Sequence, residues 1–104
     1  MARFDVHTHP DKSLRERTPF LLDVQNSHLG GLNTRVVVPL RVVSVFPFQM
    51  RDLNPRFSVS GTEVIMDTAA LAAFPALELR TAVSSLQSEA DTIVSALDTL
   101  FGSY

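Results

Sequence analysis

Alternating polar and apolar side chains near the N-terminus predict two short strands joined by a charged loop. Residues 3–8 alternate in the way that a strand with one buried face requires, and the pattern ends at His9-Pro10. Residues 11–19 are dense in charge and bounded by prolines, so they are expected to form an exposed loop. The strand pattern resumes over 20–24, and Gly30-Gly31 then indicates a turn, where glycine allows positive φ angles.

The middle of the chain predicts one fully buried strand and one hairpin. Residues 35–40 are almost continuously apolar and β-branched, which is typical of a strand buried on both faces. Pro39 lacks an N–H group, so it is expected at an edge, a bulge or a strand end. Residues 42–55 have no clear period, and Pro47 argues against a helix there. Residues 56–59 and 63–66 flank Ser60-Gly61-Thr62, and this pattern predicts a hairpin.

The C-terminal part of the chain predicts an amphipathic helix. One helical face is apolar, comprising Leu86, Ala90, Ile93, Val94, Leu97, Leu100 and Phe101. Ser84 and Gln87 have capping-box spacing at its start, and Gly102 predicts a left-handed end. Residues 69–73 fit either a helical turn or a strand, while Leu77 and Leu79 suggest one more brief strand. The fold class is therefore mostly β, a small antiparallel barrel or half-barrel plugged by a C-terminal helix.

Size and composition indicate one domain over residues 1–104 and narrow the possible classes of function. A chain of 104 residues with 45% hydrophobic and 19% charged residues is expected to fold around a single core. The net charge of −2 provides no general attraction to phosphate, which argues against a direct nucleic-acid ligand. The absence of cysteine excludes a disulfide scaffold and fits a reducing compartment. Without an apolar run of about 20 residues, we expect a soluble cytoplasmic protein.

Asp5-x-His7-x-His9 is the strongest candidate for metal chemistry. Alternate residues of a strand project to one side, so two imidazoles at this spacing could hold a divalent ion. The pattern resembles the opening of the amidohydrolase metal site, but that site needs further ligands and a barrel of roughly 250 residues. The one remaining histidine is His28. We therefore interpret His7 and His9 as partly exposed histidines at a strand end, and we expect no metal and no cofactor.

Other catalytic patterns are weak, which favours a non-enzymatic protein. There is no G-x-S-x-G motif, and Gly30-Gly31 lacks the spacing of a phosphate-binding loop. Arg35 beside Thr34, and Arg41 near Glu63, could serve a ribonuclease, although surface arginines without a catalytic role are commoner. Tyr104 beside the terminal carboxylate is either a frayed end or an interface contact, since such contacts favour tyrosine.

A block in the first half of the chain carries a family resemblance. The runs Phe20-Leu21-Leu22-Asp23-Val24-Gln25 and Asn33-Thr34-Arg35-Val36-Val37-Val38-Pro39-Leu40 resemble the F-V-D-V-Q and N-T-R-L-V-I-P-L block of CcdB-type toxins. Leu53-x-Pro55, Met66 and Phe74-Pro75 follow in family order, so the similarity covers nearly the whole chain. The resemblance implies an SH3-like, CcdB/MazF-like barrel with a C-terminal helix, assembled as a homodimer. It also implies a toxin without a catalytic site that binds the A subunit of DNA gyrase and is neutralised by a CcdA-like antitoxin with a disordered tail.

The same resemblance implies which residues form the two binding surfaces. The gyrase-binding positions are His28, Leu29, Asp98, Phe101, Gly102, Ser103 and Tyr104. Leu29 and Phe101 fit the family pattern, whereas the others depart from it and a C-terminal tryptophan is missing. The antitoxin-binding positions are Arg15, Arg17, Arg41, Phe46 and Phe48, whose arginines suit an acidic tail. The alternatives are a MazF-like endoribonuclease toxin and a non-toxic protein-binding homologue.

Overall fold

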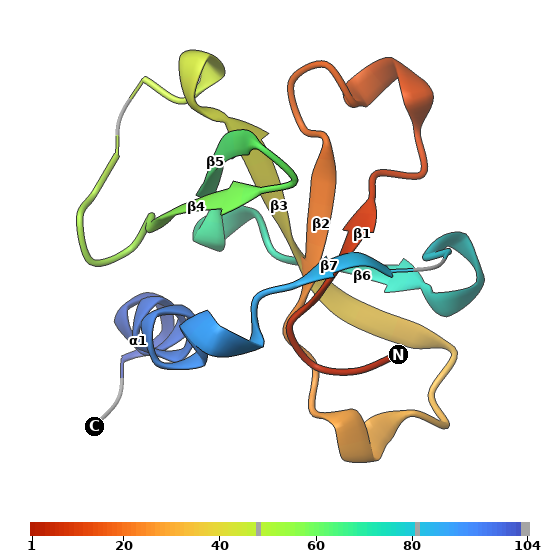
Figure 1. Cartoon of the computed structure of the whole chain (residues 1–104). Coiled ribbons are helices and arrows are strands. Elements are labelled where there is room, and N and C mark those ends of the chain that lie inside the picture. Colours follow the sequence, from red (N-terminus) through yellow and green to blue (C-terminus); the bar gives the residue numbers. More distant parts are fainter. Residues whose placement is uncertain (48, 81, 103–104) are drawn as a thin grey trace.

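Within the residues that the structure describes, seven antiparallel strands form one curled half-barrel sheet, and a single α-helix follows them (Figure 1). The computed structural model describes residues 1–47, 49–80 and 82–102. Its elements are β1 (Asp5–Thr8), β2 (Phe20–Asp23), β3 (Thr34–Val42), β4 (Arg56–Val59), β5 (Thr62–Met66), β6 (Ala72–Pro75), β7 (Ala82–Ser85) and α1 (Ala90–Phe101). The prediction of a mostly β fold with a C-terminal helix is confirmed.

The long strand β3 lies at the centre of the sheet because it has pairing partners on both edges. One edge pairs with β2, while the other pairs with β6 over residues 34–37 and with β5 over residues 40–42. Pro39 lies between these two stretches, and its carbonyl accepts a hydrogen bond from the Asp67 amide at 3.0 Å. The prediction of an edge, bulge or strand end for Pro39 is therefore wrong. Its missing N–H falls where β3 changes partners, so the ladder loses no bond there.

The remaining pairings place β4 and β7 at the two ends of the sheet. The order is β4-β5-β3-β2-β1-β7, with β6 beside β3. The predicted hairpin is confirmed, since β4 and β5 pair from Val59↔Thr62 to Arg56↔Ile65. Ser60 and Gly61 form its turn with φ angles of 49° and 81°. Positive φ at both turn residues matches the right-handed twist of the flanking strands.

Both faces of the central strands are buried, as the continuous apolar pattern of residues 35–40 predicted. The larger cluster joins even-numbered residues of β1, β2 and β3 to β4, β5 and α1, and includes Val6, Leu22, Val38, Leu40, Phe57, Val64, Ile93 and Ala96. A smaller cluster of Leu21, Val37 and Leu79, with Phe74 against it, covers the opposite face. Odd-numbered side chains of β1–β3 are therefore also withdrawn from water.

The predicted turn near Gly30-Gly31 forms without positive φ angles, and the predicted capping box of the helix does not form. Gly30 has a φ of −64°, and Gly31 is not among the glycines with positive φ. The chain reverses there through a 3₁₀ turn, Ser27–Leu29, capped by the Asn26 side chain. Ser84 belongs to β7, and α1 begins only at Ala90, so the predicted capping box does not form.

In the segment before α1, the last strand lies at later residues than the sequence predicted. Residues 69–73 contribute to both predicted alternatives, a 3₁₀ turn at Thr68–Ala70 and strand β6. Leu77 and Leu79 are not in a strand, because a 3₁₀ turn covers Ala76–Glu78 and the strand comes later as β7. The prediction for Gly102 is confirmed: its φ is 77°, and its amide donates to the Asp98 carbonyl at 2.8 Å.

Candidate partner-binding surfaces

The turn between β2 and β3 presents exposed side chains from a well-bonded backbone. The Asn26 side chain accepts a hydrogen bond from the His28 amide at 2.8 Å, and the Leu32 amide donates to the Leu29 carbonyl at 3.2 Å. His28 is exposed, and Leu29 and Leu32 are 47% and 53% exposed. We define residues 26–33 as the β2–β3 turn. It carries two of the predicted gyrase-binding residues, His28 and Leu29, and adds Leu32 as an apolar neighbour.

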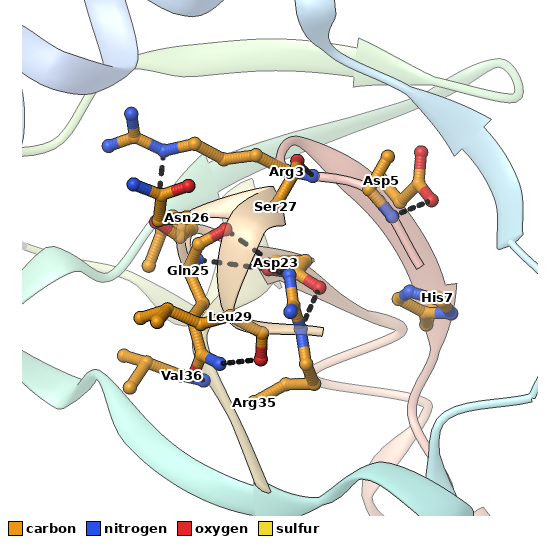
Figure 2. Close-up of polar contacts among 12 residues, drawn as sticks. Arg3, Asp5, His7, Asp23, Gln25, Asn26, Ser27, Leu29, Arg35 and Val36 are labelled. Atoms are coloured by element: carbon orange, nitrogen blue, oxygen red, sulfur yellow. Dashed lines mark hydrogen bonds and ion pairs between the residues drawn. The ribbon is translucent and has the colours of Figure 1, made fainter. Parts of the chain in front are cut away.

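A buried polar cluster lies beneath this turn (Figure 2). The Arg35 Nε and one terminal nitrogen donate to the two carboxylate oxygens of Asp23, both at 2.8 Å. That terminal nitrogen also donates to the main-chain carbonyl of Gln25 at 3.2 Å. The Gln25 side chain accepts from the Val36 amide at 2.9 Å and donates to the Leu29 carbonyl at 3.4 Å. The cluster therefore connects both strands to the β2–β3 turn.

The N-terminal segment holds the same turn from another side. The Arg3 amide donates to the Ser27 hydroxyl at 3.0 Å, and the Arg3 Nε donates to the Val24 carbonyl at 3.0 Å (Figure 2). The Arg3 guanidinium also lies 4.8 Å from the centre of the Phe4 ring, within the range of a cation–π contact. The turn is thus bonded to the N-terminal segment at Ser27 and to Gln25 at Leu29.

The other predicted gyrase-binding residues lie at the end of α1. Asp98 and Gly102 are exposed, and Phe101 is 70% exposed although it ends a helix whose Ile93 and Ala96 are fully buried. In Figure 1 the end of α1 and the β2–β3 turn occupy separate places on the molecule. The structure therefore does not bring these two groups together within one chain. Ser103 and Tyr104 lie outside the described residues.

The β1–β2 loop, which carries the predicted antitoxin-binding residues Arg15 and Arg17, meets the end of β3 at the opposite end of β2 from the β2–β3 turn (Figure 1). The Val42 amide donates to the Arg17 carbonyl at 2.9 Å. Arg41 donates to the Thr18 hydroxyl at 2.7 Å and pairs with the Asp67 carboxylate at 2.6 Å. Phe46, half-buried, follows directly after this contact, and Phe48 lies outside the described residues. The structure thus brings Arg17 and Arg41 to one region.

Arg15 lines an open cleft beside this region. Its Nε donates to the His9 carbonyl at 2.6 Å. The cleft has a volume of about 470 Å³ and is lined by Thr8, Pro10, Arg15, Leu77, Glu78 and Arg80. Leu77 is 93% exposed at its rim. Among the described residues, neither Arg15 nor Arg80 forms an ion pair, so guanidinium groups are available to an acidic ligand.

The histidines of the Asp5-x-His7-x-His9 pattern are buried, so their interpretation as partly exposed residues is wrong. His7 is 1% and His9 is 6% exposed. The His7 Nδ1 lies 2.7 Å from the Arg80 carbonyl, and the His9 Nδ1 accepts from the Asp11 amide at 3.0 Å. The segment from β6 to β7 covers this face of the sheet, which local sequence pattern does not reveal. No group of three potential metal ligands occurs within residues 1–47, 49–80 and 82–102.

The surroundings of His9 disfavour its charged form. Burial lowers the pKa of His9 below its usual value of 6.5, and Arg15 and Arg41 lower it further, while Asp11 opposes the shift. The imidazole also meets the Phe74 ring edge-on, with ring centres 5.9 Å apart. Hydrogen bonds from Ser13 hold the pKa of the exposed Asp11 carboxyl below its usual 3.8. His9 is therefore a neutral packing residue near pH 7.

The arginine arrangement considered for a ribonuclease is not formed. Arg35 is 2% exposed and bonded to Asp23, so its guanidinium cannot meet a phosphate at the surface. Arg41 pairs with Asp67 rather than with Glu63. Asp23, Gln25 and Arg35 belong to the block that carried the family resemblance, but nothing in the sequence alone indicated that their side chains meet beneath a turn. Arg80 and Leu32 had no sequence signal either.

The comparisons with known proteins agree with this architecture. A family model described as CcdB protein matches residues 3–102 of the chain. A search of curated proteins found no match. Among the described residues, no helix is long and apolar enough to cross a bilayer. The family match covers nearly the whole length, and it agrees with the half-barrel and C-terminal helix. This chain therefore belongs to the CcdB family, a family of toxins from toxin–antitoxin systems rather than of catalytic enzymes.

Proposed function

We propose that this protein is the toxin of a type II toxin–antitoxin system, acting in the cytoplasm by binding the A subunit of DNA gyrase and poisoning the enzyme. The proposal rests on family membership and on one structural observation, the exposed Phe101 at the end of an otherwise well-packed helix. A large aromatic side chain on a fixed element provides the kind of contact that dominates protein interfaces. The mechanism is binding rather than catalysis.

A homodimer accounts for the separation of the two predicted groups of gyrase-binding residues. Within one chain, the β2–β3 turn, which carries His28 and Leu29, lies away from the end of α1, which carries Asp98, Phe101 and Gly102 (Figure 1). We propose that the dimer presents its two C-terminal ends side by side and that the target contacts both copies. Ser103 and Tyr104 extend this surface in the proposal. The dimer is expected to form from a single 104-residue domain.

Titration calorimetry against the gyrase fragment, meaning the dimerisation fragment from the A subunit of bacterial gyrase, tests the proposal. We expect the full chain to bind, and we expect deletion of Gly102-Ser103-Tyr104 or the Phe101→Ala substitution to weaken binding at least thirtyfold, because loss of a central contact typically costs about 2 kcal/mol or more. Unchanged affinity in both variants would exclude the proposed surface. Cleavage of purified mRNA by the wild-type protein would instead favour the endoribonuclease alternative.

We further propose that Arg15, Arg17, Arg41, Phe46 and Phe48 bind the acidic tail of a CcdA-like antitoxin. The cleft beside Arg15 supports this assignment, because it combines guanidinium groups with an exposed apolar rim at Leu77. Because Arg41 is already paired with Asp67, we expect Arg15 and Arg17 to contribute more than Arg41 to antitoxin binding. Complementary charge mainly accelerates association and makes it sensitive to salt.

Charge reversal at the loop tests the antitoxin surface. The double variant Arg15→Glu/Arg17→Glu is expected to slow association with the cognate antitoxin at least tenfold at low salt, as measured by surface plasmon resonance. Arg56→Glu is the control, since Arg56 is exposed on β4, outside the proposed surfaces. Arg56→Glu changes the net charge by half as much as the double variant, so an effect half as large on the logarithm of the association rate would mean that only net charge matters. Binding to gyrase should remain unchanged in all three proteins.

A further inference from the structure

We propose that Asp23, Gln25 and Arg35 are positioning residues that hold the β2–β3 turn in the conformation that binds the target. This inference rests on the proposed function, because it assigns the turn to the gyrase-binding surface. It extends that proposal in two ways. It gives a role to three buried residues that touch no partner, and it adds Leu32 to the apolar side chains that the turn presents.

The bonds of the cluster converge on Gln25, whose side chain makes the one bond of the cluster that reaches the turn (Figure 2). The Asp23 carboxylate accepts hydrogen bonds from the Arg35 side chain and, at 2.9 Å, from the Gln25 amide. The last residue of β2 therefore fixes the backbone where the chain leaves the sheet. Arg35 in turn binds the Gln25 carbonyl from β3. The Gln25 side chain then spans from the Val36 amide to the Leu29 carbonyl. Each of the three residues therefore connects a strand to the chain that continues into the turn.

Stability alone does not explain this arrangement. A buried ion pair is often no more stabilising than apolar side chains of the same volume, because both charges lose their hydration. Here one terminal nitrogen of Arg35 is also buried without a hydrogen-bond partner among the described residues, which is a further cost. What the pair does supply is a fixed geometry, since a guanidinium and a carboxylate joined by two bonds have few alternative arrangements.

A fixed turn matters because its exposed leucines lie outside the sheet. Leu29 and Leu32 are about half exposed, so packing against the core does little to order them. Their backbone is held by short-range bonds within the turn and by its links to Gln25 and Arg3. Ordering such a segment at the moment of binding would cost affinity, and a turn formed beforehand avoids that cost.

The test compares Gln25→Leu with Asn54→Leu. Gln25→Leu keeps the ion pair and the Gln25 carbonyl and removes only the side-chain bonds to Val36 and Leu29. Asn54 is a matched control, because its buried side chain also makes two main-chain bonds, accepting from Met50 at 3.1 Å and donating to Met66 at 3.0 Å. These residues lie far along the chain from the β2–β3 turn. Both substitutions should reduce overall stability by similar amounts.

Amide hydrogen exchange of the free full-length protein is the first readout. We expect Gln25→Leu to accelerate exchange at His28, Leu29 and Leu32 at least tenfold, whereas Asn54→Leu leaves these three rates unchanged. The second readout is affinity for the gyrase fragment, which should fall about tenfold in Gln25→Leu and stay constant in Asn54→Leu, a factor that equals about 1.4 kcal/mol.

The two readouts separate this inference from the function on which it rests. Unchanged exchange in the turn of Gln25→Leu would overturn the positioning role, whatever the gyrase result. Faster exchange with undiminished gyrase affinity would also overturn it. If the wild-type protein fails to bind the gyrase fragment, the proposed function is wrong, and the exchange rates alone still decide whether the cluster fixes the turn.

Discussion

Asp23 and Arg35 are the most deeply buried charged residues in the part of the chain that the structure describes. Asp23 is 0% and Arg35 is 2% exposed. Asp23 is the last residue of β2, and Arg35 lies near the start of β3. Removing a charged group from water costs considerable free energy, so each of these two charges needs the other as its counter-ion. Removing one partner therefore has a different effect from removing both.

Asp23→Asn is expected to destabilise the protein by about 3–5 kcal/mol, because the Arg35 charge remains buried without its counter-ion. The double variant Asp23→Leu/Arg35→Met should recover most of this loss. Urea unfolding at one fixed protein concentration measures both, since the stability of the proposed dimer depends on concentration. A double variant as unstable as the single one would contradict the view that the pair supplies geometry rather than net stability.

His9 makes stability depend on pH. Its pKa is lowered in the folded protein, mainly by burial, so the unfolded chain binds a proton more readily below pH 6.5. The stabilisation is therefore complete above the unfolded pKa of 6.5 and is lost as pH falls through the folded value. In His9→Gln, the decrease in unfolding free energy between pH 7.5 and pH 5 should be smaller than in the wild type. Equal decreases in the two proteins would contradict this role.

At the scale of elements, the hairpin β4–β5 is specified by its own turn. Ser60 and Gly61 both have positive φ, and the added Cβ of an alanine at Gly61 would meet no atom within 4 Å. Any penalty at Gly61 therefore comes from the backbone conformation alone. Gly31 is the natural comparison, because it also has free space around it but lacks a positive φ.

Gly61→Ala is expected to destabilise the protein by about 1–2 kcal/mol, the cost of placing a Cβ in the left-handed region. Gly31→Ala should be neutral or stabilising by up to about 1 kcal/mol, since it restricts only the unfolded chain. Thermal unfolding of the two variants under the same conditions checks the difference. A loss of similar size at Gly31 would mean that the turn requires glycine there for another reason.

At the scale of the whole molecule, α1 combines a structural role with a proposed binding role. Ile93 is fully buried in the larger core cluster, whereas Phe101, two turns later, is 70% exposed. The helix pattern assigned both residues to the same apolar face, but only Ile93 of the two is buried in the structure. A helix that extends beyond the core leaves its last aromatic side chain available to a partner.

Ile93→Ala is expected to reduce the unfolding free energy by about 2–5 kcal/mol through loss of buried contacts and formation of a cavity. Phe101→Ala should change the stability of the chain by less than about 0.5 kcal/mol, because little of the ring is buried. Denaturant unfolding under conditions that keep the protein monomeric would compare them. A large loss in Phe101→Ala would indicate that the ring packs within its own chain.

Features encoded over a few neighbouring residues were predictable from the sequence. The strands β1 to β5, the hairpin connection at Ser60-Gly61, and the helix with its Gly102 end follow from local pattern, although Thr62 belongs to β5 and not to the connection as predicted. The family resemblance carried by the block from Phe20 to Leu40 was confirmed by the match over residues 3–102. The strand β7 was missed, because Ala82–Ser85 has no strong apolar alternation and becomes a strand only by pairing with β1.

The sequence by itself determined the class of fold and the family, because periodicity, turn residues and a linear motif are properties of neighbouring positions. Tertiary structure alone decided which polar residues are buried and which of the proposed binding residues lie close together. His7 and His9 become buried only because the segment from β6 to β7 crosses their face of the sheet, and Arg35 meets Asp23 only because β2 and β3 pair in one register. These contacts join residues far apart in the chain, so no local pattern could specify them.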